Sequence, residues 1–188
     1  MWIILLVCDA DRSFRKLSHA FEGSAESRRS LYHDYLHWYK QGDVVLDYGC
    51  GDGVWLDLLR GEDIVGLGVD KDLDLVHQLT QRGIKAFNHL EDVDIPYSTV
   101  TLMHVIEHLH PLEAVRLVAE LSTGIDSMLL VTPNIEHGSV QVDFWKDITH
   151  IRPYPAVVLE ALMHECGFTN LEQGQSNAGY DVWVFGTR

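Results

Sequence analysis

The sequence has few cysteines and few positive charges. Its three cysteines, Cys8, Cys50 and Cys166, are an odd number with no C-x-x-C pair, which argues against a disulfide framework or a zinc knuckle and favours a reduced, cytoplasmic setting. The sequence has 14 lysines and arginines against 28 acidic residues, so its formal net charge is −14, and it contains no run of basic residues. This charge would repel phosphate backbones, so nucleic acid is not an expected partner. The expected partner is a small-molecule, sugar-like or protein acceptor.

Long apolar runs are also lacking. The run at residues 2–8 is far shorter than the roughly 18 residues that a membrane span needs, and no basic segment of a secretory signal precedes it. We therefore expect no membrane span. The run is interpreted as an edge strand or an apolar tail packed on the domain, and a lipid-modified Cys8 is the alternative.

No internal repeat, low-complexity tract or linker divides the 188 residues, so a single domain, 1–188, is expected. Apolar runs and helical periodicities alternate along it. Strands are predicted near 44–48, 64–69, 84–87, 99–104, 127–132, 168–174 and 180–186, and helices near 54–60, 72–82, 112–122 and 154–166. This order predicts an α/β fold, a Rossmann-like, doubly wound, mainly parallel seven-stranded sheet with an antiparallel edge strand.

Two further segments flank this core. Residues 26–40 show helical spacing, and with the residues before them they form an N-terminal cap segment, 1–40. Residues 133–153 are too long for a plain connection and are rich in polar and aromatic side chains. Long loops in compact domains are usually lids or binding loops, so this segment is predicted to be a lid over the carboxyl ends of the strands.

The stretch VVLDYGCGDG at 44–53 predicts a buried parallel strand that runs into a glycine turn at the start of a helix. Cofactors that resemble nucleotides rest on such bare backbone. Carboxylates at Asp47 and Asp52 would repel a pyrophosphate but attract the ammonium and sulfonium of S-adenosylmethionine. Val54 also stands where a dinucleotide fingerprint has its third glycine, so a nicotinamide oxidoreductase is disfavoured.

Asp70 ends the next predicted strand, 23 residues after Asp47. An acid at this position is placed to accept hydrogen bonds from a ribose diol. The spacing is shared by adenosine cofactors in general, so it supports the glycine loop without choosing among them.

Four further motifs carry a resemblance: FEGS at 21–24, HVIEHL at 104–109, TPN at 132–134 and DITHIRP at 147–153. With the glycine loop, they make the chain resemble the class I S-adenosylmethionine-dependent methyltransferases from about residue 19 onward. The nearest likeness is to a subfamily associated with O-antigen and surface polysaccharide synthesis. The resemblance implies the class I methyltransferase fold and methylation of a saccharide or another small acceptor with a hydroxyl group.

The resemblance also assigns roles to single residues. It places the methionine end of the cofactor at Asp47, Gly49, Cys50 and Gly51, the ribose at Asp70 and Lys71, the adenine at His89 and Leu90, the sulfonium side at His104, and a closing segment at Phe21 and Gly23. His89 stands where the family usually has an aspartate, so the adenine contact departs from the family pattern.

Three residues are candidate catalytic groups. His108 is a candidate general base, with a structural role or a helix cap as the alternative. On the lid, His150 and Asp147 are placed to orient or deprotonate an acceptor hydroxyl, or else to fix the shape of the loop. Phe144 and Trp145 either stack on a sugar ring or anchor the loop. No metal site is expected, because His104 and His108 lack the H-E-x-x-H order and follow a predicted strand.

The predicted function is therefore methyl transfer from S-adenosylmethionine. The alternative is a module that binds the donor and serves as a partner subunit without transferring the methyl group itself, which the missing aspartate at position 89 and the lack of an added acceptor domain motivate. The oligomeric state stays open.

Overall fold

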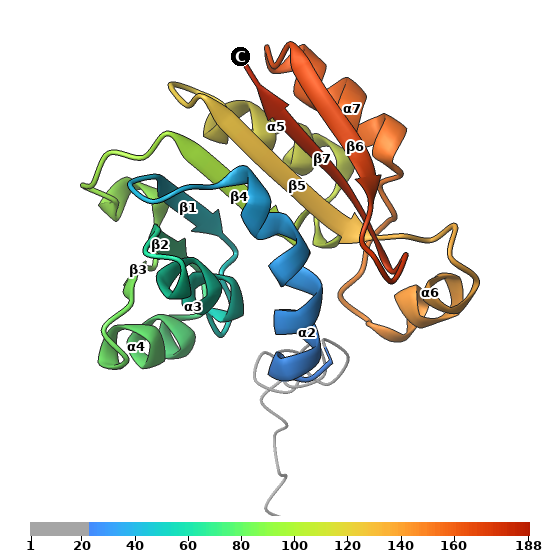
Figure 1. Ribbon diagram of the computed structural model, residues 1–188. Coiled ribbons are helices and arrows are strands. Elements are labelled where there is room, and N and C mark those ends of the chain that lie inside the picture. Colours follow the sequence, from blue (N-terminus) through green and yellow to red (C-terminus); the bar gives the residue numbers. More distant parts are fainter. Residues whose placement is uncertain (1–22) are drawn as a thin grey trace, which may run out of the picture.

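The computed structural model describes residues 23–188, which form a seven-stranded sheet with helices on both faces (Figure 1). The strands are β1 (Val44–Tyr48), β2 (Val65–Val69), β3 (Lys85–Phe87), β4 (Thr99–Met103), β5 (Ser127–Pro133), β6 (Asn170–Gln175) and β7 (Asp181–Thr187). The α-helices are α2 (Ala25–Tyr32), α3 (Val54–Gly61), α4 (Leu73–Gln81), α5 (Pro111–Leu121), α6 (Gly138–Asp143) and α7 (Ala156–Glu165). Short 3-10 helices are η1 (His33–Trp38), η2 (Leu90–Asp92), η3 (Ile106–His108) and η4 (Phe144–Lys146).

The strand order is β3-β2-β1-β4-β5-β7-β6. Strands β1 to β5 are parallel, and β7 is antiparallel to both β5 and β6, so the predicted Rossmann-like fold is confirmed. The strand order reverses between β1 and β4, and the crevice at such a switch point is where open α/β sheets bind ligands. The register aligns Asp47 with Thr101, and Pro133 with Asp181.

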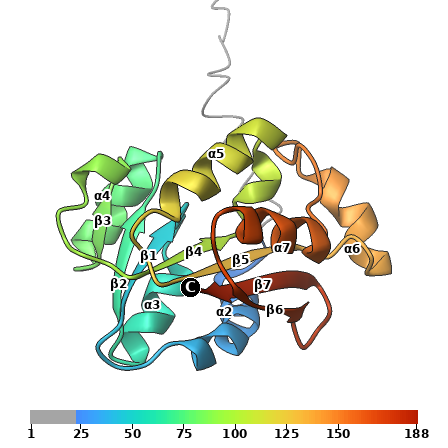
Figure 2. The same cartoon turned by 90° about the horizontal axis from the view of Figure 1, so that it is seen from above.

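Two apolar clusters hold the layers together. One lies between the sheet and the helices α2, α3 and α4, and the other lies between the opposite face and α5 and α7. Figure 2 shows α5 and α7 on one side of the strands and α2 and α3 on the other. Strands buried on both faces need continuous apolar runs, and all five residues of β4 are buried.

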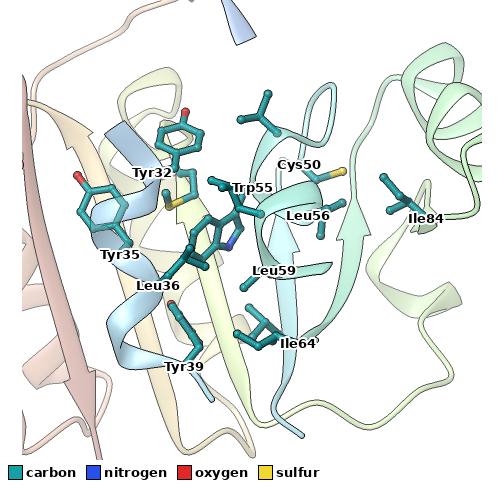
Figure 3. Packing of buried hydrophobic residues seen from close by; sticks show 14 of the residues in the cluster. Tyr32, Tyr35, Leu36, Tyr39, Cys50, Trp55, Leu56, Leu59, Ile64 and Ile84 are labelled. Atoms are coloured by element: carbon teal, nitrogen blue, oxygen red, sulfur yellow. The ribbon is translucent and has the colours of Figure 1, made fainter. Parts of the chain in front are cut away.

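Trp55 lies at the centre of the first cluster. Trp55 is 1% exposed, and its side chain extends from the first turn of α3 to pack against the aromatic residues of the N-terminal segment (Figure 3). Its ring meets that of Tyr39 edge-on at 5.6 Å. Because Trp55 follows the glycine loop directly, this packing holds α2 and η1 beside the loop.

The N-terminal segment is not one helix over 26–40 as predicted. The α-helix ends at Tyr32 and a 3-10 helix, His33–Trp38, continues the chain. A 3-10 helix has three residues per turn, so side chains three apart share a side. Tyr35 and Trp38 are stacked accordingly, and Trp38 also packs on Trp183 and Phe185. Contacts with β7 thus override the expected helical periodicity.

The predicted loop at 133–153 contains regular structure. It begins with the last residue of β5 and includes α6 and η4, beyond the carboxyl end of β5 in Figure 1. Phe144 is 1% exposed, so of its two predicted roles, stacking on a sugar ring and anchoring the segment, the structure supports the second. Trp145 is 62% exposed and does not serve as an anchor.

Within residues 23–188, no helix is long and apolar enough to cross a membrane. The predictions for the apolar run 2–8, for Cys8 and for Phe21 lie outside the described residues.

Candidate active site

A cavity of about 270 Å³ lies at the carboxyl ends of β1, β4 and β5. The glycine loop forms one wall, and the residues that follow β4 form another. Residues of α2 and of the 133–153 segment complete the enclosure. This cavity lies at the switch point, where a cofactor crevice is expected.

Gly49 and Gly51 have positive φ values of 77° and 52°, which favour glycine. A Cβ on Gly49 would lie 2.5 Å from Val105 Cγ2, so this glycine permits close packing against the end of β4. At Gly51 no atom lies within 4 Å of an added Cβ. The loop is therefore packed on one side and open at Gly51, where bare backbone faces the space a ligand would take.

Asp47 is 1% exposed, and Thr101 Oγ1 donates a hydrogen bond of 3.0 Å to its Oδ1. Burial raises the pKa of Asp47 to about 7; the Thr101 hydrogen bond opposes this rise and the charge of Asp70 adds to it. Removing a carboxylate from water disfavours its charged form. A cationic ligand beside Asp47 would restore the charged form, which suits the ammonium of S-adenosylmethionine.

Asp52 does not offer a second free negative charge as the sequence argument assumed. Arg28 of α2 forms two hydrogen bonds to it, Nη1 to Oδ1 at 3.1 Å and Nη2 to Oδ2 at 2.6 Å. The guanidinium balances the charge of Asp52 and ties α2 to the glycine loop. Of the two acids expected to attract a cation at this loop, Asp47 therefore remains the candidate. No local pattern marks Arg28, because it lies 24 residues before Asp52.

Asp70, Lys71, His89 and Leu90 do not line the cavity. They follow β2 and β3, whose carboxyl ends lie along the same edge as that of β1, as an extended adenosine would require. Asp70 Oδ2 accepts the N–H of Gly51 at 2.9 Å and Oδ1 accepts that of Asp72 at 2.8 Å. Lys71 and His89 are exposed.

Gly23 also lies outside the cavity lining. It is exposed, with φ +75°, and directly precedes Ser24, the N-cap of α2. Its positive φ supplies a turn into the helix, which is a structural role independent of any cofactor contact.

His104 follows β4 and has a φ of +57°, which is uncommon for a residue other than glycine. Its ring lies between two buried carboxylates, with Nδ1 3.3 Å from Glu107 Oε1 and Nε2 3.4 Å from Asp181 Oδ1. Burial raises the pKa of Asp181, and its contacts with His104 and Tyr35 oppose the rise. Backbone strain of this kind concentrates at functional sites.

Neither carboxylate was predicted from the sequence. Glu107 lies within the HVIEHL motif at 104–109, and this motif is the local signal that indicates it. Asp181 begins β7 and reaches this edge because β7 runs antiparallel to β5. No local signal in the sequence indicates that placement.

The structure brings the three candidate catalytic residues together. The rings of His108 and His150 lie 4.8 Å apart, and Asp147 Oδ2 lies 3.8 Å from His150 Nε2. Thr149 Oγ1 bonds both Asp147 Oδ1, at 2.6 Å, and His108 Nδ1, at 2.8 Å. Burial lowers the pKa of His150. The same contacts line the cavity and fix the shape of the segment, so both alternatives for these residues have structural support.

Residues 19–173 match the methyltransferase domain family. The chain belongs to this family. It is therefore an enzyme, a methyltransferase, rather than a nicotinamide oxidoreductase or a module that only binds the donor. The cofactor expected from the glycine loop, S-adenosylmethionine, is confirmed at the level of this family and its fold.

Solved structures share the fold of the methyltransferase at low sequence identity. A SAM-dependent methyltransferase from Archaeoglobus fulgidus is similar with a TM-score of 0.81 and 20% identity over 93% of this chain and 99% of that one. The magnesium protoporphyrin IX methyltransferase of Synechocystis, solved with SAH, has a TM-score of 0.69 and 14% identity over 96% and 95% of the two chains. An O-methyltransferase family 2 protein from Planctomyces limnophilus, in complex with apigenin, has a TM-score of 0.70 and 17% identity over 94% and 62%. No curated protein matches the chain.

The raised pKa of Asp47 predicts how the stability of the ligand-free enzyme depends on pH. The pKa is about 7 in the folded protein and 3.8 ordinarily, so the bound proton stabilises the folded state. This contribution is complete below the ordinary pKa and is lost as the pH rises through the folded value. Between pH 5 and pH 8 the wild type should lose about 3 kcal/mol relative to Asp47→Asn, whose side chain does not ionise.

Urea unfolding of the two proteins at pH 5 and pH 8 measures this difference. Thr101 and Asp70, the other groups that act on Asp47, are present in both proteins, so their own effects largely cancel. An equal change in both proteins between the two pH values would contradict the prediction.

Proposed function

We propose that the enzyme transfers the methyl group of S-adenosylmethionine to a hydroxyl oxygen of a small acceptor, with saccharides as the favoured class. One observation carries the proposal. The same cavity is lined by the glycine loop with Asp47 and by the polar side chains of His108, Asp147 and His150. A donor held at the loop and an acceptor held by the polar wall would therefore meet inside one enclosure.

The proposed reaction needs alignment more than covalent help from the protein. The acceptor oxygen attacks the methyl carbon in line with the sulfur, an O–C bond forms, and the C–S bond breaks with its electrons left on sulfur. The proton of the hydroxyl group passes to solvent or to His108, the candidate general base. Holding both reactants in this geometry supplies much of the acceleration. Asp47 would bind the ammonium group of the donor, and the wall of the cavity formed by η4 and the residues after it would exclude water.

A hydroxyl acceptor is favoured by the polar groups that face the cavity. His108, Asp147 and His150 offer hydrogen-bond acceptors, and a hydroxyl group has the hydrogen that such acceptors bind and position. The saccharide class rests on the resemblance of FEGS, HVIEHL, TPN and DITHIRP to the polysaccharide-associated subfamily. The fold neighbour crystallised with apigenin is an O-methyltransferase, which supports oxygen as the acceptor atom without naming the substrate.

The test is a methyl-transfer assay with radiolabelled S-adenosylmethionine and panels of monosaccharides, oligosaccharides and phenols. We expect transfer of label to hydroxyl groups, with release of S-adenosylhomocysteine in equal amount, and the highest rate among the saccharides. Label found on nitrogen or carbon would refute an O-methyltransferase. Labelling of phenols alone would refute the saccharide class and leave the oxygen acceptor in place.

A further inference from the structure

A group of potential metal ligands lies in the cavity wall opposite the glycine loop. Among the described residues, Glu107, His108 and His150 each offer one ligand atom, and these atoms lie within 4.8 Å of one another. Ligands bound to one cation at about 2.0–2.2 Å are separated by less than this, so small side-chain movements bring the three atoms to bonding distance. His104, which the sequence spacing pairs with His108, is not part of this group, because its ring lies between Glu107 and Asp181.

The hydrogen bond of His150 leaves the required lone pair on its ring. Its Nδ1 lies 2.6 Å from the carbonyl oxygen of Phe144. A carbonyl oxygen only accepts hydrogen bonds, so Nδ1 carries the proton and donates it. Nε2 is then the unprotonated nitrogen. A carbonyl that orients a histidine through its second nitrogen is the usual support of a metal-binding imidazole.

The same reasoning applies to His108. The hydroxyl of Thr149 has one hydrogen, which it donates to Asp147 Oδ1 at 2.6 Å. Its contact of 2.8 Å with His108 Nδ1 must therefore be one in which the ring nitrogen donates. His108 Nε2 is left unprotonated. Both imidazoles are thus held in the tautomer with an unprotonated Nε2, the form of the ring that binds a metal cation.

Glu107 supplies the independent observation that points to a cation. Its side chain is fully buried, Oε2 accepts a hydrogen bond from Thr132, and Oε1 has no hydrogen-bond partner among residues 23–188. His104 Nδ1 lies 3.3 Å from Oε1 in an ion-pair contact. A fully buried carboxylate oxygen that accepts no short hydrogen bond is costly unless it has a further partner such as a cation.

We propose that Glu107, His108 and His150 bind one divalent transition-metal cation in the acceptor side of the cavity. Two imidazoles and one carboxylate suit Zn²⁺, Mn²⁺, Fe²⁺ or Co²⁺ better than Mg²⁺ or Ca²⁺, which prefer oxygen ligands. Three protein ligands leave coordination positions open, as in catalytic rather than structural sites. Asp147, whose Oδ2 lies 3.8 Å from His150 Nε2, is close enough to accept a hydrogen bond from a bound water or hydroxyl.

The cation would have a defined task in the proposed reaction, and this part of the inference rests on the proposed function. An acceptor hydroxyl that binds the cation is more acidic than in water and loses its proton to solvent more readily. The oxygen then attacks the sulfonium methyl, the O–C bond forms, and the C–S electrons stay on sulfur in neutral S-adenosylhomocysteine. Acceptors with two neighbouring oxygens, such as vicinal diols, would bind through both open positions.

Co²⁺ titration of the untagged, EDTA-treated full chain tests the site, with visible absorption as the readout. We expect one equivalent to bind with a dissociation constant in the micromolar range or below, with d–d bands typical of nitrogen and oxygen ligands. His108→Gln and His150→Gln should each weaken binding at least 100-fold. His77→Gln removes an exposed histidine of α4 and should bind as the wild type does. Thermal melts show whether each variant is folded.

Several outcomes would overturn the site: no stoichiometric binding, binding that survives in both His108→Gln and His150→Gln, or equal weakening in His77→Gln. Calorimetry with S-adenosylmethionine on the metal-free enzyme measures donor binding separately from cation binding, so failure of one proposal can be distinguished from failure of the other. Co²⁺ binding without methyl transfer to any hydroxyl would support the site and refute the proposed function. Full methyl transfer in excess EDTA would refute the catalytic task of the cation and leave the proposed function standing.

Discussion

Asp47→Asn is expected to weaken binding of S-adenosylmethionine about 100-fold. The carboxylate is 1% exposed at the end of β1, and a hydrogen bond to a charged group contributes about 1.5–3 kcal/mol, of which 2.8 kcal/mol corresponds to about 100-fold. A nearly dry site places Asp47 in the upper part of that range. Asparagine keeps the size of the side chain and an oxygen that can accept the Thr101 hydrogen bond, so the change removes mainly the charge. Isothermal titration calorimetry at pH 8 measures the effect.

Asp63→Asn is the matched control. Asp63 is exposed and has a φ of +57°, a conformation that asparagine tolerates. The affinity of the Asp63→Asn variant for S-adenosylmethionine should therefore equal that of the wild type. The melting temperature gives a second readout. Saturating S-adenosylmethionine should raise the melting temperature of the wild type and barely change the melting temperature of Asp47→Asn. Equal affinities of Asp47→Asn and wild type would show that the glycine loop does not bind the cationic end of the donor.

Trp55→Ala is expected to lower the free energy of unfolding by about 3–5 kcal/mol, as loss of a large buried aromatic side chain usually does. Trp55 is 1% exposed and joins α3 to the aromatic residues of the N-terminal segment. The cavity left behind would separate α2 and η1 from the glycine loop. A loss of this size is a large part of the total stability of a domain, so the variant should be partly unfolded at 37 °C. Urea unfolding followed by circular dichroism measures it.

Two other substitutions calibrate this result. Trp55→Phe keeps most of the apolar volume and removes an indole N–H that is buried without a hydrogen-bond partner among the described residues, so its cost should be near 1 kcal/mol. Trp145→Ala removes a tryptophan that is 62% exposed and should change stability by about 0.5 kcal/mol or less. If Trp55→Ala is no less stable than Trp145→Ala, the aromatic cluster does not hold the N-terminal segment in place.

The order and type of the core elements were predictable because each depends on local pattern. The run VVLDYGCGDG at 44–53 predicts a buried strand and a glycine turn, and the structure has β1 followed by glycines with positive φ. Periodicity likewise located the helices α3, α4, α5 and α7 to within a few residues. The N-terminal segment departed from its pattern because Trp38 packs on Trp183 and Phe185, which lie far away in the sequence.

The candidate site divides in the same way. Asp47, His104 and His108 adjoin strand ends that the sequence located, and His150 and Asp147 lie in a segment whose length suggested a lid. Three groupings of side chains were not predicted. They are the salt bridge from Arg28 to Asp52, the ion-pair contact of His104 with Asp181, and the cluster of Glu107, His108 and His150. Each joins residues from separate elements, and the last is the basis of the metal site proposed above, where the sequence led us to expect none.

The sequence by itself determined the succession of strands and helices, the glycine loop and the methyl donor, because strand periodicity, glycine conformation and carboxylate charge are properties of short stretches of chain. Tertiary structure alone decided which charges are balanced and which side chains share the cavity wall. The antiparallel course of β7 carries Asp181 to the edge where β4 ends, and the 133–153 segment folds back to place His150 beside His108. Distances of this kind arise from packing between elements, for which no short stretch of sequence contains the information.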